Sequence, residues 1–177
     1  MTKKQFAKIR RYCVGGRKAV FIGTAIAGLI VIALELIEGL PLLNPYTYIT
    51  VIVCALLGGG LYLVGAVATK REFRRCTEQL RSRGRLEAAV ADLYCGEPVY
   101  RGSFLFGKQY FAAKGYGTIF AISETDRLYL TPPREQDGYS FIYAECGGST
   151  YSLGEASPRN IEAAKKVEEA FAERKTL

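Results

Sequence analysis

The residue types that most often carry enzyme chemistry are sparse in this sequence. The 177 residues include no histidine, which removes histidine general bases, histidine-dependent triads and histidine-containing metal sites. No two cysteines have the CxxC spacing of a zinc or redox site. We therefore predict a non-enzymatic protein with no catalytic residues, no metal and no cofactor. The cysteines, expected to be free thiols, are Cys13, Cys54, Cys76, Cys95 and Cys146.

Two of these cysteines lie beside basic residues. A reactive or acylated Cys13 or Cys76 is therefore the alternative to an ordinary thiol.

One stretch comes close to a phosphate-binding loop. "GSFLFGKQ", residues 102–109, nearly matches GxxxxGK[ST]. Such a loop needs flexible small residues, a Ser or Thr for Mg²⁺ and a helix after it. Here the interior is Phe-Leu-Phe, Gln109 stands in place of the hydroxyl residue, and the following "QYFAAK" has the pattern of a strand. We interpret Gly107 and Lys108 as a hairpin turn. The acid pair Glu124 and Asp126 is likewise expected in a solvated turn.

Charge is distributed unevenly along the chain, whose net charge is +7. Residues 1–18 hold seven basic and no acidic residues, and residues 70–85 hold seven basic and two acidic ones. From Leu86 onward, 13 acidic residues outnumber 10 basic ones. A nucleic-acid-binding protein carries its basic patch on the folded domain. Because the domain here is slightly acidic, no nucleic-acid partner is expected.

Two apolar stretches lie between the basic clusters. A bilayer core needs about twenty mainly apolar helical residues, and Ala19 to about Ile37 and Tyr46 to about Thr69 meet that requirement. The connection "EGLPLLNPY" is short, which favours a transmembrane helical hairpin. A cleaved signal peptide is the alternative for the first stretch, but no small-x-small cleavage site stands at its end, directly before the connection.

The basic clusters predict how the hairpin is oriented. Both flank its outer ends, while the connection holds no Lys or Arg. By the positive-inside rule, both termini are cytoplasmic. The same clusters are expected to meet the membrane surface and to attract anionic lipid head groups. These predicted membrane-surface residues are Arg10, Arg11, Arg17, Lys18, Lys70, Arg71, Arg74 and Arg75.

Small residues recur at helical spacing in both apolar stretches. Gly23 and Ala27 are four apart, as are Ala55 and Gly59. Such faces let helix backbones approach closely, which is the main attraction between helices in lipid. We predict that these faces hold the hairpin, or a dimer of hairpins, together. A bend at "GGG" lining a substrate path is the alternative.

The rest of the chain predicts a stalk and a β domain. Residues 70–96 are expected to form a juxtamembrane helical stalk with a break at Gly84, after a basic tail (1–18) and the hairpin (19–69). Short runs rich in Tyr, Phe, Ile and Thr then predict antiparallel strands within residues 97–177. Ser157 and Pro158 open a closing helix. The expected strands are "VYRGSFLF", "QYFAAK", "GTIFAIS", "RLYLTP", "YSFIYAEC" and "TYSLGE".

The expected fold is an α+β membrane protein in which a transmembrane hairpin precedes a small antiparallel β-meander or roll closed by a carboxy-terminal helix. A meander with "GTIFAISETDRLYL" in its middle and a helix after "SLGEASPRN" resembles uncharacterised bacterial two-span membrane proteins whose cytoplasmic domain is similar to the pleckstrin-homology-like (PH-like) fold. The resemblance covers about Glu97 to Arg174. It implies a bacterial cytoplasmic membrane and a binding or scaffold module, sometimes for lipid head groups or peptides.

Two functions are consistent with these patterns. The first is a non-enzymatic, membrane-anchored binding or scaffold module whose partners are the bilayer, anionic lipid head groups, a protein of unknown identity or a second copy of the chain. The alternative is an accessory subunit of a transport or secretion complex, with its two spans packed against a larger membrane protein.

Overall fold

The computed structural model describes residues 1–15, 26, 30, 33, 37 and 45–176. Apart from four single positions, the predicted first span from Ala19 to about Ile37 lies outside the described residues. The predicted site residues Arg17, Lys18, Gly23 and Ala27 lie outside them as well.

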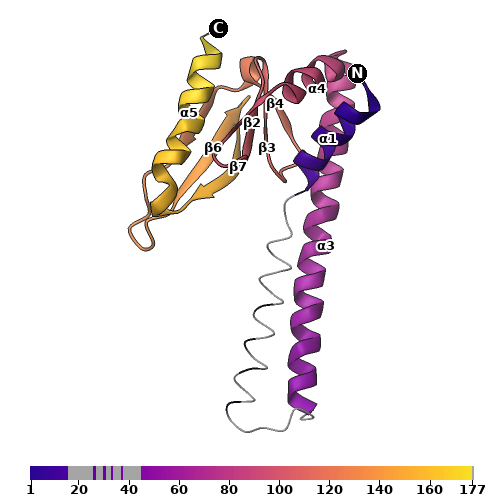
Figure 1. Ribbon diagram of the computed structural model, residues 1–177, viewed down its shortest axis with the longest axis vertical. Coiled ribbons are helices and arrows are strands. Elements are labelled where there is room, and N and C mark those ends of the chain that lie inside the picture. The colour runs from indigo at the N-terminus through magenta and orange to yellow at the C-terminus, as the bar shows by residue number, and fades with distance from the viewer. Residues whose placement is uncertain (16–25, 27–29, 31–32, 34–36, 38–44, 177) are drawn as a thin grey trace.

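The chain has an α+β fold with two antiparallel sheets and a carboxy-terminal helix (Figure 1). The α+β class, the antiparallel strands and the closing helix were predicted, whereas the division of the strands into two sheets was not. Two short 3₁₀ turns, Ile122–Glu124 and Pro158–Asn160, join some of its elements. The elements are α1 (Lys3–Val14), α3 (Pro45–Ser82), α4 (Leu86–Tyr94), β1 (Glu97–Val99), β2 (Phe104–Phe106), β3 (Tyr110–Ala113), β4 (Ile119–Ala121), β5 (Arg127–Leu130), β6 (Ser140–Cys146), β7 (Ser149–Ala156) and α5 (Ile161–Lys175).

Helix α3 is a single helix of 38 residues that leaves the folded part and extends far from it (Figure 1). It ends at Ser82, just before Gly84, whose φ of +68° lies in the left-handed region that glycine adopts readily. The chain then turns into α4. The predicted break at Gly84 is therefore confirmed.

The first sheet has the order β1-β2-β3-β4, and the second has the order β5-β6-β7. All neighbouring strands are antiparallel. The prediction of one strand over "VYRGSFLF" is wrong, because this run contains the last residue of β1, a tight turn and β2. Tyr100, Arg101 and Gly102 all have positive φ, and the Ser103 amide donates to the Tyr100 carbonyl at 3.0 Å. The chain consequently reverses direction, giving seven strands where six were expected.

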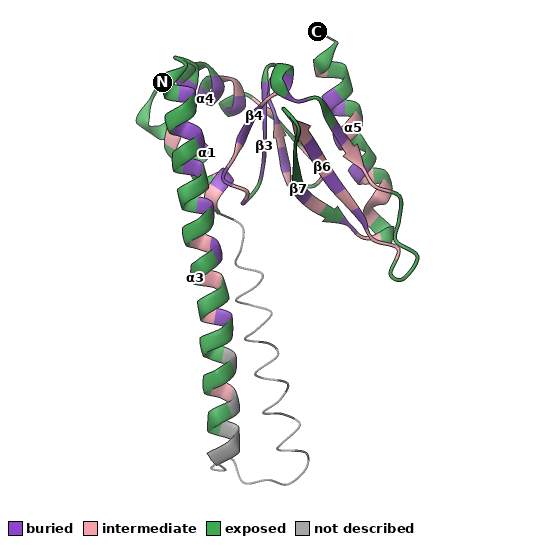
Figure 2. Cartoon of the chain, turned by 180° about the vertical axis from the view of Figure 1, so that it is seen from behind, coloured by how far each residue is buried: buried purple, intermediate pink, exposed green. Residues whose placement is uncertain are grey.

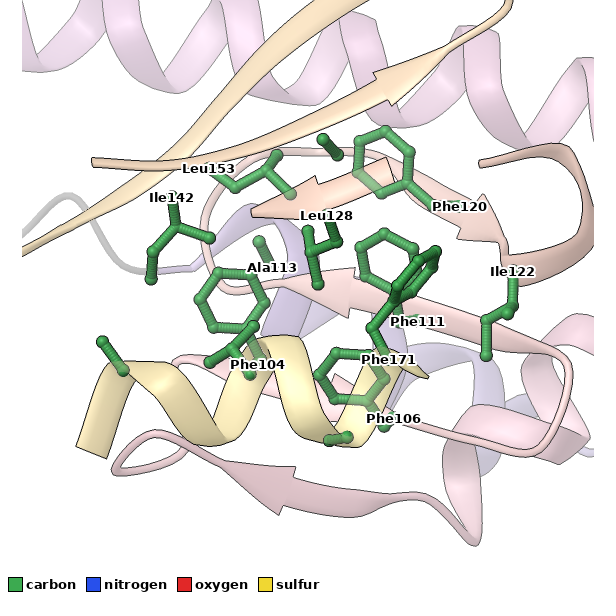
Figure 3. Packing of buried hydrophobic residues seen from close by; sticks show 14 of the residues in the cluster. Phe104, Phe106, Phe111, Ala113, Phe120, Ile122, Leu128, Ile142, Leu153 and Phe171 are labelled. Atoms are coloured by element: carbon green, nitrogen blue, oxygen red, sulfur yellow. The ribbon is translucent and has the colours of Figure 1, made fainter. Parts of the chain in front are cut away.

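The inner face of the first sheet, the second sheet and α5 enclose the central core (Figure 3). Phe111 of β3 lies at its centre, with its ring centroid 5.0 Å from that of Phe120 and 5.9 Å from that of Phe171 on α5. Helix α5 contributes one apolar face to this core, on which Ala164, Val167 and Phe171 are buried and Ile161 is half-buried.

The other face of the first sheet is also covered. Side chains alternate along β3, so that Phe111 enters the central core while Tyr110 and Ala112 pack against helices. This second cluster, the helical core, joins α1, α3 and α4 to the sheet. Its buried members are Ile9, Cys13, Phe73, Cys76, Leu80, Leu86, Ala89, Val90, Leu93, Tyr110, Ala112 and Ile119.

Helix α1 was not predicted, although its sequence carries a signal for it. Thr2 and Gln5 form a capping box, in which the Gln5 amide donates to Thr2 Oγ1 at 3.3 Å and the Thr2 amide donates to Gln5 Oε1 at 2.8 Å. Phe6, Ile9 and Cys13 follow at the spacing of one helical face. The basic segment is thus an amphipathic helix packed on the fold.

Candidate functional site

The part of α3 that extends away from the folded part is largely exposed (Figure 2). Up to Ala68, the exposed residues described in this helix are apolar or aromatic. Soluble proteins rarely expose a contiguous apolar surface of this extent. Among the described residues, α3 is the one helix whose length and composition would allow it to cross a membrane. We call its exposed large apolar side chains the apolar surface: Tyr48, Ile49, Ile52, Val53, Leu56, Leu57, Leu61, Leu63, Val64 and Val67.

The predicted small-residue face of α3 is open. Ala55 is exposed and Gly59 is half-buried. Among the residues that the structure describes, no atom beyond the neighbouring residues and backbone of α3 lies within 4 Å of a Cβ placed on Gly59. Two other glycines of this helix, Gly58 and Gly65, are buried.

Basic side chains gather where the apolar surface ends. Lys70 follows three residues after Val67, the last exposed large apolar residue of α3. Helix α1 lies beside this part of α3, with the ring centroids of Phe6 and Phe73 5.9 Å apart. Six of the eight predicted membrane-surface residues are therefore brought together, and all six are exposed. This basic band consists of Arg10, Arg11, Lys70, Arg71, Arg74 and Arg75.

From Phe73 onward, one face of α3 is built into the fold. Phe73, Cys76 and Leu80 are at most 9% exposed and belong to the helical core. The Ile119 amide of β4 donates to Cys76 Sγ at 3.3 Å. Packing and bonding of this kind give the helix a fixed direction relative to the sheet, since a tightly packed core deforms little.

The loop between β3 and β4 ties α1 and α3 to the sheet. The Gly115 and Gly117 amides donate to the carbonyls of Tyr12 and Cys13 at the end of α1, at 3.2 and 2.9 Å. Gly117 has φ +74°, and a Cβ there would come within 2.5 Å of the Thr69 carbonyl oxygen of α3. Only glycine therefore allows this close approach.

The turn that resembles a phosphate loop holds a carboxylate from the chain itself. Asp92 of α4 accepts hydrogen bonds from three consecutive amides, those of Lys108, Gln109 and Tyr110, at 2.8–2.9 Å. The hairpin predicted at Gly107 and Lys108 is confirmed by the pairing of β2 with β3. Successive amides of this kind form an anion-binding concavity, and here Asp92 fills it. The role of Asp92 was not predicted, because the amides that it binds lie 16–18 residues further along the sequence.

Burial controls the chemistry of two cysteines. Desolvation, and secondarily the nearby Cys76, raise the pKa of the Cys13 thiol to about 12. Desolvation also raises the pKa of Cys76. Both thiols therefore stay protonated at neutral pH, which makes them poor nucleophiles. Cys95 is exposed, and the side chain of Cys54 lies outside the described part of the chain.

A cleft of about 880 Å³ lies between α3, β4 and the turn joining β6 to β7. Its walls carry charges of both signs, including Glu72, Arg75 and Glu78 of α3. The aromatic side chain of Tyr151 on β7 also lines the cleft. Glu124 at its edge forms ion pairs with Arg83 and Arg85, at a 3₁₀ turn.

Asp126, the second acid of the predicted pair, is hydrogen-bonded to the turn between β6 and β7. Asp126 Oδ2 accepts from the Gly147 amide at 2.9 Å. No group of three His, Cys, Asp or Glu residues suited to a metal ion occurs in the part of the chain that the structure describes. Comparison with protein-family models, curated proteins and solved structures finds no match.

Proposed function

We propose that this protein is a non-enzymatic, membrane-anchored binding or scaffold module. Helix α3 crosses the bacterial cytoplasmic membrane together with the apolar stretch Ala19 to about Ile37, and both termini are cytoplasmic. The folded domain is then presented on the inner face of the membrane.

The observation that carries this proposal is the continuity of α3. One end is apolar and exposed, the middle is basic, and one face of the other end is buried in the helical core. In lipid the exposed apolar side chains would be favourably solvated, and the basic band would lie at the negatively charged inner surface. A helix that is both anchor and core element fixes the height and direction of the domain above the membrane.

The arrangement of the domain supports a PH-like fold. A four-stranded antiparallel sheet precedes a three-stranded one, and a carboxy-terminal helix packs on the core between them. We propose that this domain binds a protein partner in the cleft beside α3. That cleft combines charges of both signs with exposed aromatic surface, as polar protein interfaces do.

Site-specific photo-crosslinking in living cells tests this function. A photoreactive residue replaces Gln79 on the cleft wall or, as the matched control, Ala172 on the exposed face of α5. We expect one discrete heterologous adduct from position 79 and none from position 172. Adducts of the same pattern from both positions, or none from position 79, would contradict a binding module that uses the cleft.

A second candidate function, the accessory subunit of a transport or secretion complex, is favoured by the open face at Ala55 and Gly59. No atom from another described segment lies within 4 Å of a Cβ placed on Gly59. Another helix can therefore approach this face of α3 closely. A photoreactive residue at Ala55 is expected to give an adduct with a larger membrane protein if this function holds. An adduct of twice the chain's own mass would instead indicate a homodimer.

A further inference from the structure

A groove runs between α1 and α3 at the end of the folded part nearest the apolar surface. Its volume is about 310 Å³. The lining residues of α1 are spaced by four, and those of α3 by three, one and three, so each set shares one helical face. The lining consists of Phe6, Arg10, Val14, Lys70, Phe73, Arg74 and Thr77.

The groove combines an apolar floor with three cations and no acidic lining residue. Arg10 and Lys70 form no ion pair with any residue that the structure describes. Arg74 Nε donates to Glu78 Oε1 at 2.8 Å, but the two side chains are 81% and 58% exposed. Water screens such a pair, so little free energy is lost when a ligand replaces it.

The groove also lies at a defined depth. Lys70 is less than one helical turn beyond Val67, where the apolar surface ends. In a bilayer that boundary is the level of the phosphate groups, with acyl chains beside Val67 and the head group beside Lys70. A ligand with an anionic head and apolar chains therefore matches both the lining and its position.

We propose that the groove between α1 and α3 is a specific site for one anionic phospholipid, whose phosphate lies among Arg10, Lys70 and Arg74 and whose chains follow the apolar surface. This inference rests on the proposed function, because α3 has to lie in a bilayer. Beyond the proposed function, this inference assigns lipid binding to the three cations that line the groove and not to the other three of the basic band. A general attraction to charged lipid would use all six cations alike.

Two triple variants distinguish the groove from general attraction. R10Q/K70Q/R74Q removes the groove cations, and R11Q/R71Q/R75Q removes three cations of the basic band that do not line the groove. Each variant changes one residue of α1 and two of α3. Each also removes one exposed ion pair, Arg74 with Glu78 or Arg75 with Glu72. The net charge and its position along the chain are thus closely matched.

The measurement is native mass spectrometry of the full chain in mild detergent, titrated with phosphatidylglycerol or with phosphatidylcholine of the same chains. The unmodified protein is expected to bind one phosphatidylglycerol at least about tenfold more tightly than phosphatidylcholine. At about fivefold per cation, the groove variant should bind it about a hundredfold more weakly, while the control variant stays within about threefold. Equal thermal midpoints for the three proteins establish that the fold is unchanged.

Three results would overturn the inference: no preference for phosphatidylglycerol, equal losses in the two triple variants, or displacement of the lipid by free glycerol phosphate at the same concentration. The proposed function fails in a different way. If alkaline carbonate without detergent releases the unmodified protein from membranes, the anchor itself is wrong, whatever the lipid titration gives.

Discussion

At the scale of single residues, Asp92 links two elements that are distant in the sequence. Its carboxylate accepts hydrogen bonds from the amides of Lys108, Gln109 and Tyr110 and so joins α4 to the hairpin between β2 and β3. A Cβ at Gly107 would collide with the same carboxylate, which is why glycine is required there. The chain thus fills its own anion-binding turn with a side-chain carboxyl group, which argues against a phosphate at this turn.

Asp92→Ala is expected to lower the free energy of unfolding by about 2–3 kcal/mol, because three amides lose a charged acceptor. The thermal midpoint of the detergent-solubilised protein should fall by several degrees. Asp137→Ala is the control, since Asp137 accepts from only one amide, that of Tyr139, in an exposed turn. Equal effects of the two substitutions would contradict the role assigned to Asp92.

The raised pKa of Cys13 predicts how stability depends on pH. The pKa of the Cys13 thiol is 9.0 in the unfolded chain and about 12 in the folded protein. The unfolded state therefore binds fewer protons across that interval, and stability falls as pH rises through it, by about 1.4 kcal/mol per pH unit. Between pH 9 and 10, the thermal midpoint of Cys13→Ala should fall less steeply than that of the unmodified protein. Cys95→Ala is the control, and a slope for Cys13→Ala as steep as the unmodified one would contradict the assignment.

At the scale of elements, α3 changes its environment along its length, from exposed apolar side chains to the helical core. The two halves should respond differently to the same kind of substitution. Apolar side chains that face lipid or detergent contribute little to the packing of the domain, whereas those in the helical core leave a cavity when they are shortened.

Phe73→Ala is expected to destabilise the domain by about 3–5 kcal/mol, since its side chain is 4% exposed and packs in the helical core. Leu63→Ala, at a position 63% exposed on the same helix, should change stability by less than about 0.5 kcal/mol. Thermal unfolding of both variants in the same detergent is the measurement. A large effect of Leu63→Ala would show that the apolar surface packs against protein.

Much of the fold follows from local patterns, and what was missed depends on contacts between distant segments. The break at Gly84, the hairpin at Gly107 and the closing helix were predictable from local preferences. The turn after β1 was not, because Tyr100 and Arg101 adopt left-handed backbone conformations that non-glycine residues rarely take. The Tyr100 hydroxyl donates to the distant Glu155 carbonyl at 3.0 Å, a contact that no local pattern reveals.

The candidate site was predictable only in part, because it combines residues from distant segments. The basic residues of the band are evident in the sequence, but their position on two adjacent helices depends on α1 packing beside α3. The runs "FLF", "YFAA" and "IFA" do indicate a sheet covered on both faces, since continuous apolar strands are typical of two-sided burial. In the structure, α1, α3 and α4 cover the face of the first sheet that points away from the central core, in agreement with this pattern.

At the scale of the whole molecule, the proposed function requires one orientation in the membrane. The apolar surface lies in the bilayer, the basic band at its inner face and the domain in the cytoplasm. The exposed Cys95, just after α4, reports on the side occupied by the domain, since Cys13 and Cys76 are buried and protonated. The half-buried Cys146 of β6 belongs to the same domain and is replaced by alanine in the labelled protein. A cysteine introduced at Asn44 reports on the predicted connection between the two spans.

Labelling with a membrane-impermeant maleimide, before and after spheroplasts are opened, is the most direct measurement. We predict that Cys95 reacts only after opening, and that an Asn44→Cys variant reacts at that position in intact spheroplasts. Reaction of Cys95 in intact spheroplasts, or recovery of the protein in the soluble fraction without detergent, would contradict the claim that α3 anchors the domain at the inner face.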